Sequence, residues 1–328
     1  MTTIQFTRYL YEVTEVKLTL TMSIINKRDD ALFWAFELFH SGVDLTPLLW
    51  TIYYDFFASI NPGFEKYLAT HLNLPVTVDT VGLVVSNFMI RPHNSDVFIL
   101  RNIINEFEIE SSDLELSALL KTGDYVAIAK RILDNTPEEK ELTDYFGKPV
   151  ALSKVPAEKR KIALLSRIIG VKTKRNLYVK SDDVTQYETL AYDVARKVLP
   201  TKANHAIDPD NYLTLFHLPR DAADIKVAYL NNWLYHASFT PLWDQRIRAH
   251  NGTVKERDVV FVTDDDMEEF YEKYGLEPDE QKAEVQQRSI RTLEQKRTWL
   301  EFCKQHCKNS VVTGIDEYVS EMDKLGAY

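Results

Sequence analysis

The sequence predicts a mainly α-helical protein, a multi-helical bundle with a small β element near residues 253–262. Three observations lead to this fold class. Apolar residues recur at helical spacing along much of the chain. Glycine accounts for only 10 of the 328 residues, against a usual share of about 7%. The clearest strand signal covers residues 253–263, where Val259 to Val262 are expected to form the core of the strand, and a short strand-like stretch covers 176–180.

Residues 31–60 carry the strongest apolar signal in the chain. Nine of these thirty residues are Phe, Trp or Tyr, and Ser41-Gly42 interrupts the run. We expect two helices, at 31–41 and 46–60, with Pro47 at the first helical position of the second one. Helices this apolar must lie at the centre of a core or against a partner.

Capping and stop signals divide the rest of the chain into further helices. These are expected at 8–27, 62–72, 78–89, 95–106, 113–120, 123–134, 157–170, 182–198, 221–236, 241–249, 265–274, 279–307 and 315–324. Residues 136–155 mix charged residues with Gly147 and Pro149, which is typical of a linker.

Charge is distributed unevenly along a chain whose net charge is −10. Residues 1–135 carry 10 basic and 17 acidic side chains, residues 136–256 carry 19 and 15, and residues 257–328 carry 10 and 17. We therefore predict an N-terminal aromatic-rich helical domain at 1–135, a basic middle helical domain at 136–256, and a short strand with an acidic helical arm at 257–328. An acidic chain argues against non-specific coating of nucleic acid.

Several large enzyme classes leave local motifs that this sequence lacks. It contains no G-x-G dinucleotide fingerprint, no G-x-x-x-x-G-K-[ST] phosphate loop, no G-x-S-x-G elbow and no H-E-x-x-H zinc helix. We accordingly predict no cofactor and no catalytic residues. The two cysteines are too few for a disulfide framework, which favours a reducing compartment. The longest apolar run, 31–36, is far too short to span a membrane.

The densest charge lies between Lys154 and Lys180, where nine basic side chains face a single acidic one, Glu158. Such a run can bind the phosphates of RNA or DNA, or the acidic face of a protein. The alternative is a helix edge that docks on the acidic flanks of the same chain. The candidate binding residues are Lys159, Arg160, Lys161, Arg167, Lys172, Lys174 and Arg175.

A second candidate interface lies in residues 231–252. Trp beside Arg is a common anchor of protein interfaces, which makes Trp243, Arg246 and Arg248 candidates for partner contact. Trp at helical spacing is also typical of a core, and we expect Trp233 to lie there.

Two clusters have ligand chemistry. Cys303, His306 and Cys307 share one helix face and are a candidate metal site, although a structural zinc needs four ligands and packing is the alternative. The carboxylates of Asp264, Asp265, Asp266, Glu268 and Glu269 can hold Mg²⁺ or Ca²⁺. Alternatively they stabilise the first turn of a helix, with Asp264 as its cap.

Three blocks of the sequence, at 31–42, 52–68 and 243–281, resemble a known family. The blocks read ALFWAFELFHSG, IYYDFFASINPGFEKYL and WDQRIRAHNGTVKERDVVFVTDDDMEEFYEKYGLEPDEQ. They resemble uncharacterised proteins of nucleocytoplasmic large DNA viruses, namely the mimivirus-like and algal giant viruses. The resemblance implies a viral origin and a virion or host-cytoplasm (virus factory) setting. It supplies no site residues.

From these observations we expect a non-enzymatic interaction protein, either a scaffold or a minor, capsid-associated virion component, whose partners are other viral proteins. The alternative is a helical adaptor that binds RNA, or the transcription or translation machinery, through the basic surface at 154–180.

Overall fold

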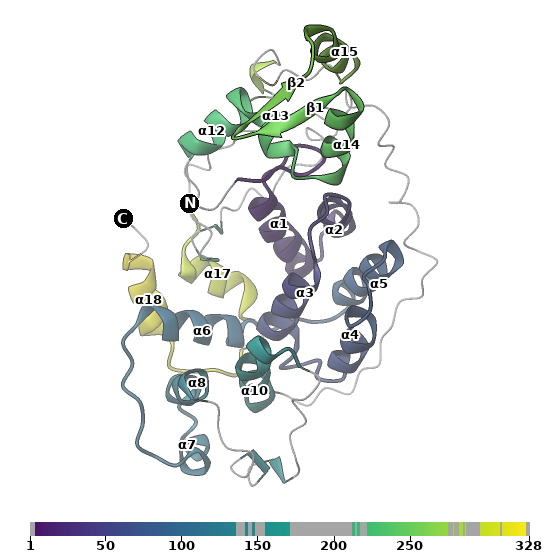
Figure 1. The fold of residues 1–328 in the computed structure, drawn as a ribbon. Helices are drawn as coiled ribbons and strands as arrows, with labels where there is room; N and C mark the ends of the chain where they lie inside the picture. Colours follow the sequence, from purple (N-terminus) through teal and green to yellow (C-terminus); the bar gives the residue numbers. More distant parts are fainter. Residues whose placement is uncertain are drawn as a thin grey trace. The chain divides into compact units, whose positions relative to one another are not determined.

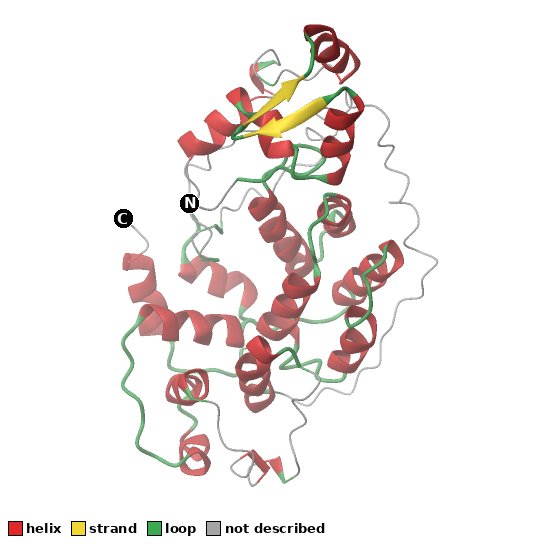
Figure 2. Cartoon of the chain, viewed as in Figure 1, coloured by secondary structure: helices red, strands yellow, loops and turns green. Residues whose placement is uncertain are grey.

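The computed structural model describes residues 4–135, 142–143, 146–147, 155–170, 212–213, 215–216, 222–274, 278, 282–284, 286, 296–308 and 310–325. Over these residues the protein is mainly helical, with one small two-stranded antiparallel sheet (Figures 1 and 2). The predicted fold class is therefore confirmed. None of the described helices is both long and apolar enough to cross a membrane.

The chain divides into two units whose segments alternate along the sequence. The first unit comprises Met1–Leu45, Thr77–Met89 and Val179–Arg297, and the second comprises Thr46–Val76, Ile90–Tyr178 and Thr298–Tyr328. This grouping differs from the consecutive division at 1–135, 136–256 and 257–328, which stays a division by charge and composition.

The first unit is built around its aromatic helix, because α2 packs against both α1 and α5. Phe33, Trp34 and Phe36 of this helix are fully buried, as expected for so apolar a segment. The elements of the unit are α1 (Val13–Asn26), α2 (Ala31–His40), α5 (Val78–Met89), α12 (Ala222–Asn231), α13 (Trp233–Ala237), α14 (Pro241–Ala249), β1 (Gly252–Lys255), β2 (Asp258–Phe261) and α15 (Asp264–Tyr274).

The second unit is built around the other half of the aromatic segment. Its elements are α3 (Thr46–Ile52), η1 (Tyr53–Phe57), α4 (Phe64–Leu72), α6 (Asp96–Glu106), α7 (Leu116–Thr122), α8 (Tyr125–Asp134), η2 (Ala157–Lys159), α10 (Arg160–Ile169), α17 (Trp299–His306) and α18 (Asp316–Leu325). The segment η1 packs against α6 and α10. Trp50, Tyr53 and Tyr54 are buried there.

The helix expected at 46–60 widens after Ile52 into the π-helical turn η1. The N–H of Ala58 donates to the carbonyl oxygen of Tyr53 at 2.8 Å, a bond that spans five residues. The turn carries Asp55, whose carboxylate is buried and accepts a 2.6 Å hydrogen bond from Nη2 of Arg101. The π turn thus brings a charged side chain to its partner within an otherwise aromatic segment.

The first helix starts later than predicted, at Val13 instead of residue 8. A backbone bridge between Phe6 and Glu12 and a positive φ of 60° at Leu10 keep the preceding residues out of the helix. The carboxylate of Glu12 accepts from the N–H groups of Thr14 and Glu15 and caps the helix. The predicted strand at 176–180 and helix at 182–198 lie outside the described residues.

The strand signal at 253–263 corresponds to two strands instead of one. Strands β1 and β2 pair antiparallel, with Val254 opposite Val259 and Thr253 opposite Val260. Residues 256–257 connect them, with a positive φ of 55° at Glu256. The expectation that Val259 to Val262 form a core is wrong, because Val260 and Val262 are exposed.

Candidate functional site

The basic run predicted as a binding surface is bonded to the chain itself wherever it is described. Nζ of Lys161 donates to the carbonyl oxygens of Leu133 and Asp134 at 2.7 and 2.9 Å, at the carboxyl end of α8. Nζ of Lys159 donates to Oγ1 of Thr51 at 2.8 Å. A lysine at a helix C-terminus satisfies carbonyls that have no partner within the helix.

The arginines of the same run are also engaged within the second unit. Nη2 of Arg167 contacts both carboxylate oxygens of Glu65, at 2.8 and 3.1 Å. Nε of Arg160 donates to the carbonyl oxygen of Val155 at 3.4 Å. These contacts support docking within the chain over binding of nucleic acid for this part of the run. The remaining candidates lie outside the described residues: Lys172, Lys174 and Arg175.

Of the predicted interface residues Trp243, Arg246 and Arg248, the first two are buried in the structure. Nε1 of Trp243 donates to the carbonyl oxygen of Arg8 at 3.0 Å. The guanidinium of Arg246 lies over the rings of Trp243 and Tyr274, 4.8 and 4.7 Å from their centroids. These cation–π contacts hold Arg246 inside the first unit. Arg248 alone is exposed.

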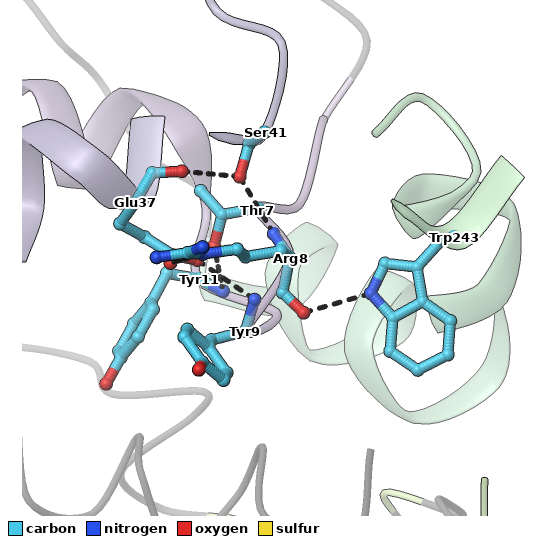
Figure 3. A network of polar contacts seen from close by, with 7 residues as sticks. All are labelled: Thr7, Arg8, Tyr9, Tyr11, Glu37, Ser41 and Trp243. Carbon is cyan, nitrogen blue, oxygen red and sulfur yellow. Dashed lines mark hydrogen bonds and ion pairs between the residues drawn. The ribbon is translucent and has the colours of Figure 1, made fainter. Parts of the chain in front are cut away.

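Trp243 belongs to a buried polar network at the start of the chain (Figure 3). Nε of Arg8 donates to Oε2 of Glu37 at 2.6 Å, and the two side chains are 1% and 0% exposed. The N–H of Tyr9 donates to Oε1 of the same carboxylate at 2.9 Å. Oγ of Ser41 accepts from the N–H of Arg8 at 2.9 Å and donates to the carbonyl oxygen of Glu37 at 2.6 Å. The network anchors the N-terminal segment to α2.

Two titratable groups near these ion pairs have shifted pKa values. Burial, reinforced by the charge of Arg8, lowers the pKa of His40 to about 4, so its imidazole is neutral at pH 7. Burial raises the pKa of Asp55 in the second unit, whereas the charge and hydrogen bond of Arg101 oppose this shift. Asp55 is buried, so a substrate in solution cannot reach its carboxylate.

The candidate metal ligands do not form a metal site. Among the described residues, which include all three side chains, no group of three His, Cys, Asp or Glu is arranged to hold a metal ion. The ring of His306 is buried and packs on Phe302, with ring centroids 4.7 Å apart. A hydrogen bond with Cys303 and burial raise the pKa of the Cys307 thiol.

Within the acidic cluster, Asp266 has a structural role. Its Oδ2 accepts from the N–H and Oγ1 of Thr263 at 3.1 and 2.6 Å, and its Oδ1 accepts from Nδ2 of Asn251 at 2.7 Å. These hydrogen bonds lower the pKa of Asp266. Oγ1 of Thr263 accepts from the N–H of Asp266, so Thr263 caps α15 and the expected cap, Asp264, is its first residue. Asp266 thereby ties both ends of the hairpin to α15.

The other four members of the cluster make no comparable hydrogen bonds with the described residues. Asp264, Asp265, Glu268 and Glu269 are exposed, and none of the four makes a side-chain hydrogen bond or ion pair with the described part of the chain. Between residues 258 and 274 there are seven carboxylates and one basic side chain, Lys273, a net charge of −6. A negative surface is left open here.

Exposed apolar side chains accompany these carboxylates. Val254, Val260, Val262 and Met267 are 43%, 41%, 76% and 40% exposed. Strand β2 contacts α15, as Figure 1 shows. We call seven residues the hairpin surface: Val260, Val262, Met267, Asp264, Asp265, Glu268 and Glu269. Val254 lies on the other face of the sheet, opposite Val259.

The hairpin is supported from one side. A Cβ at Gly252 would lie 2.7 Å from Cγ2 of Ile247, so β1 approaches α14 closely at this point. On the opposite face of the pleat, the register places Val260 across from Thr253 and Asp258 across from Lys255, and all four are exposed. One face of the sheet is packed and the other is open.

One local signal in the sequence marks this hairpin. Glu256 and Arg257 interrupt the apolar alternation and divide the segment into two short strands. A lone hairpin covers only one of its faces by packing on helices, so the valines of the other face stay in water. Comparison with protein-family models, curated proteins and solved structures found no match to this chain.

Proposed function

We propose that this chain is a non-enzymatic interaction protein of a nucleocytoplasmic large DNA virus, acting as a scaffold or as a minor, capsid-associated component of the virion. The hairpin surface carries the proposal. Exposed apolar side chains rimmed by polar ones are typical of protein-binding surfaces. Here they lie on a hairpin that Asp266 ties to α15 and that packs on α14.

The ion pairs of the other charged groups support the same function. Arg8 and Glu37 form a buried ion pair, Asp55 pairs with Arg101, and Arg167 pairs with Glu65. Each of these contacts joins segments distant in sequence and holds the fold together. The hairpin surface combines exposed apolar side chains with carboxylates that have no side-chain partner among the described residues.

The setting follows from the resemblance of the blocks at 31–42, 52–68 and 243–281 to proteins of giant viruses. The third block spans the hairpin and α15. We therefore place the protein in the virion or in the virus factory of the host cytoplasm, with other viral proteins as its partners.

Carboxylate-to-lysine cross-linking tests this function. Purified particles and infected cells are treated with a zero-length carbodiimide reagent and analysed by mass spectrometry. We expect the chain at a reproducible copy number in particles, with Asp264, Asp265, Glu268 or Glu269 joined to lysines of another viral protein. Glu108 and Glu110, exposed carboxylates of the second unit, are the internal control and should give few such links.

Two results would overturn the proposal in separate parts. Absence of the chain from particles removes its role as a virion component. Absence of protein cross-links at the hairpin surface, in particles and in infected cells alike, removes its role as an interaction protein that uses this surface.

A further inference from the structure

The hairpin surface has the charge, side chains and backbone of a site for one class of ligand. Its four free carboxylates lie within six residues, and none of them is paired with a basic side chain of the described residues. Anionic ligands such as RNA or acidic lipid headgroups are repelled by this charge. A second copy of the chain that presents the same face is repelled as well.

The backbone of the hairpin favours an extended ligand. The sheet of the described residues has two strands, so each strand has one edge without a third strand beside it. An exposed strand edge is a template for pairing with another extended segment. The N–H of Val259 donates to the carboxylate of Asp258 at 2.8 Å, so a ligand strand that pairs with this N–H must displace that carboxylate.

The exposed valines match the repeat of such a ligand. Val260 lies in β2 and Val262 one residue past its end, and both are exposed. Two residues is the period at which side chains of an extended chain return to the same side. A ligand strand with apolar residues at every second position can cover these valines. Basic residues at the alternate positions then lie where they can reach the carboxylates of α15.

We propose that the hairpin surface binds a basic, extended segment of a partner protein, in which lysine or arginine alternates with apolar residues. This inference rests on the proposed function and names the chemistry of the partner. The apolar side chains cover Val260 and Val262, and the basic side chains pair with Asp264, Asp265, Glu268 and Glu269. Binding requires no chemical step.

The experiment uses the full chain and a fluorescein-labelled peptide of nine residues in which lysine and valine alternate. Affinity is measured by fluorescence anisotropy over a range of salt concentrations. A peptide of equal composition with its lysines and valines in two blocks tests the need for alternation. A peptide in which glutamate replaces lysine tests the sign of the charge.

Two variants of the chain test the two halves of the surface. Neutralising the four carboxylates (D264N, D265N, E268Q and E269Q together) should weaken binding of the alternating peptide by about tenfold and flatten its salt dependence. The variant Val262→Lys should also weaken binding, because it replaces an apolar contact by a repelling charge. The matched control neutralises Glu108 and Glu110 of the second unit and should leave the affinity unchanged.

The outcomes separate this inference from the proposed function. Equal binding by the chain with neutralised carboxylates, or equal binding of the blocked and alternating peptides, overturns the inference. If the peptide fails to bind while the cross-links to viral proteins are found, the function stands and the partner has another chemistry. Far-UV circular dichroism and the urea midpoint of each variant show that it is folded.

Discussion

Two charged regions of the first unit differ in whether their carboxylates are bonded within the chain. The Arg8–Glu37 pair is buried, and both oxygens of its carboxylate accept hydrogen bonds. In α15, Asp264 and Glu268 are exposed and have no side-chain partner among the described residues. The buried carboxylate accepts a hydrogen bond from a backbone N–H group that would otherwise lack a partner. Helix α15 carries more carboxylates than are needed to stabilise its N-terminus. The additional carboxylates are available to a partner protein.

The basic helix α10 of the second unit resembles the buried case more than the exposed one. Lys161 satisfies the carbonyl end of α8, and Arg167 pairs with Glu65. Charge density along the sequence is therefore a poor guide to binding. The basic side chains of α10 have partners within the chain, whereas the four carboxylates of the hairpin surface have none among the described residues.

The largest effect that tests this comparison is expected at Glu37. Replacing it by alanine leaves the charge of Arg8 buried without its carboxylate and removes the acceptor for the N–H of Tyr9. We expect the free energy of unfolding to fall by about 3–5 kcal/mol. Urea denaturation followed by circular dichroism measures it.

The matched control for Glu37→Ala is Glu268→Ala on α15, where the stability should change by less than about 0.5 kcal/mol. Comparable losses of unfolding free energy in the two variants would contradict the distinction between carboxylates that are bonded within the chain and carboxylates that are exposed.

A smaller effect is expected at Arg167, which is partly exposed and pairs with Glu65. The variant Arg167→Met keeps much of the aliphatic stem and removes the ion pair, so the second unit should lose about 1 kcal/mol. If the same variant keeps its stability but loses affinity for RNA, Arg167 belongs to a binding surface and not to the fold. Urea denaturation and an RNA gel-shift assay on one preparation distinguish the two results.

A still smaller effect, below about 1 kcal/mol because the half-buried ring is screened by solvent, is expected from His40. Its pKa is lowered to about 4 in the folded state, against the ordinary histidine value of 6.5. The unfolded chain thus binds a proton between these two pH values that the folded chain does not bind. Stability should fall as the pH drops below about 6.5 and level off near 4.

Unfolding measured at pH 7.5, 6 and 5 reveals this dependence, and in His40→Gln the decline should be shallower. His236, whose pKa burial also lowers, contributes in the same direction and leaves a residual slope. An identical slope in His40→Gln and the parent chain would show that folding does not change the pKa of His40.

The ends of two helices were predictable from local signals, whereas the helix expected at 279–307 is interrupted by the non-helical residues 296–298, after which α17 begins at Trp299. Pro241 opens α14 and Gly42 follows the end of α2 with a positive φ of 77°, so both helices have the predicted bounds within a residue or two. The π turn at Tyr53–Phe57 was not predicted, and its Asp55 contacts a residue, Arg101, that lies 46 residues away in the sequence.

The candidate sites were harder to predict than the helices, because they depend on contacts between residues that are distant in the sequence. Trp243 and Arg246 look like interface anchors in the sequence, but the carbonyl of Arg8 and the ring of Tyr274 take them inside the first unit. The exposure of Val262 required knowing that no third strand covers the hairpin within the described residues. Local patterns specify which residues can bind, whereas tertiary contacts decide which of them are left free.

The smallest effect is expected from neutralising Glu268 and Glu269 together. Both lie beyond the first turn of α15, where the helix dipole gains little from a negative charge. Their replacement by glutamine relieves repulsion among seven neighbouring carboxylates, so we expect the unfolding free energy to stay within about 0.5 kcal/mol of the parent value or to rise slightly. A loss above about 1 kcal/mol in urea denaturation would mean that these carboxylates hold α15 in place, and the acidic half of the hairpin surface would then be structural, as Glu37 is.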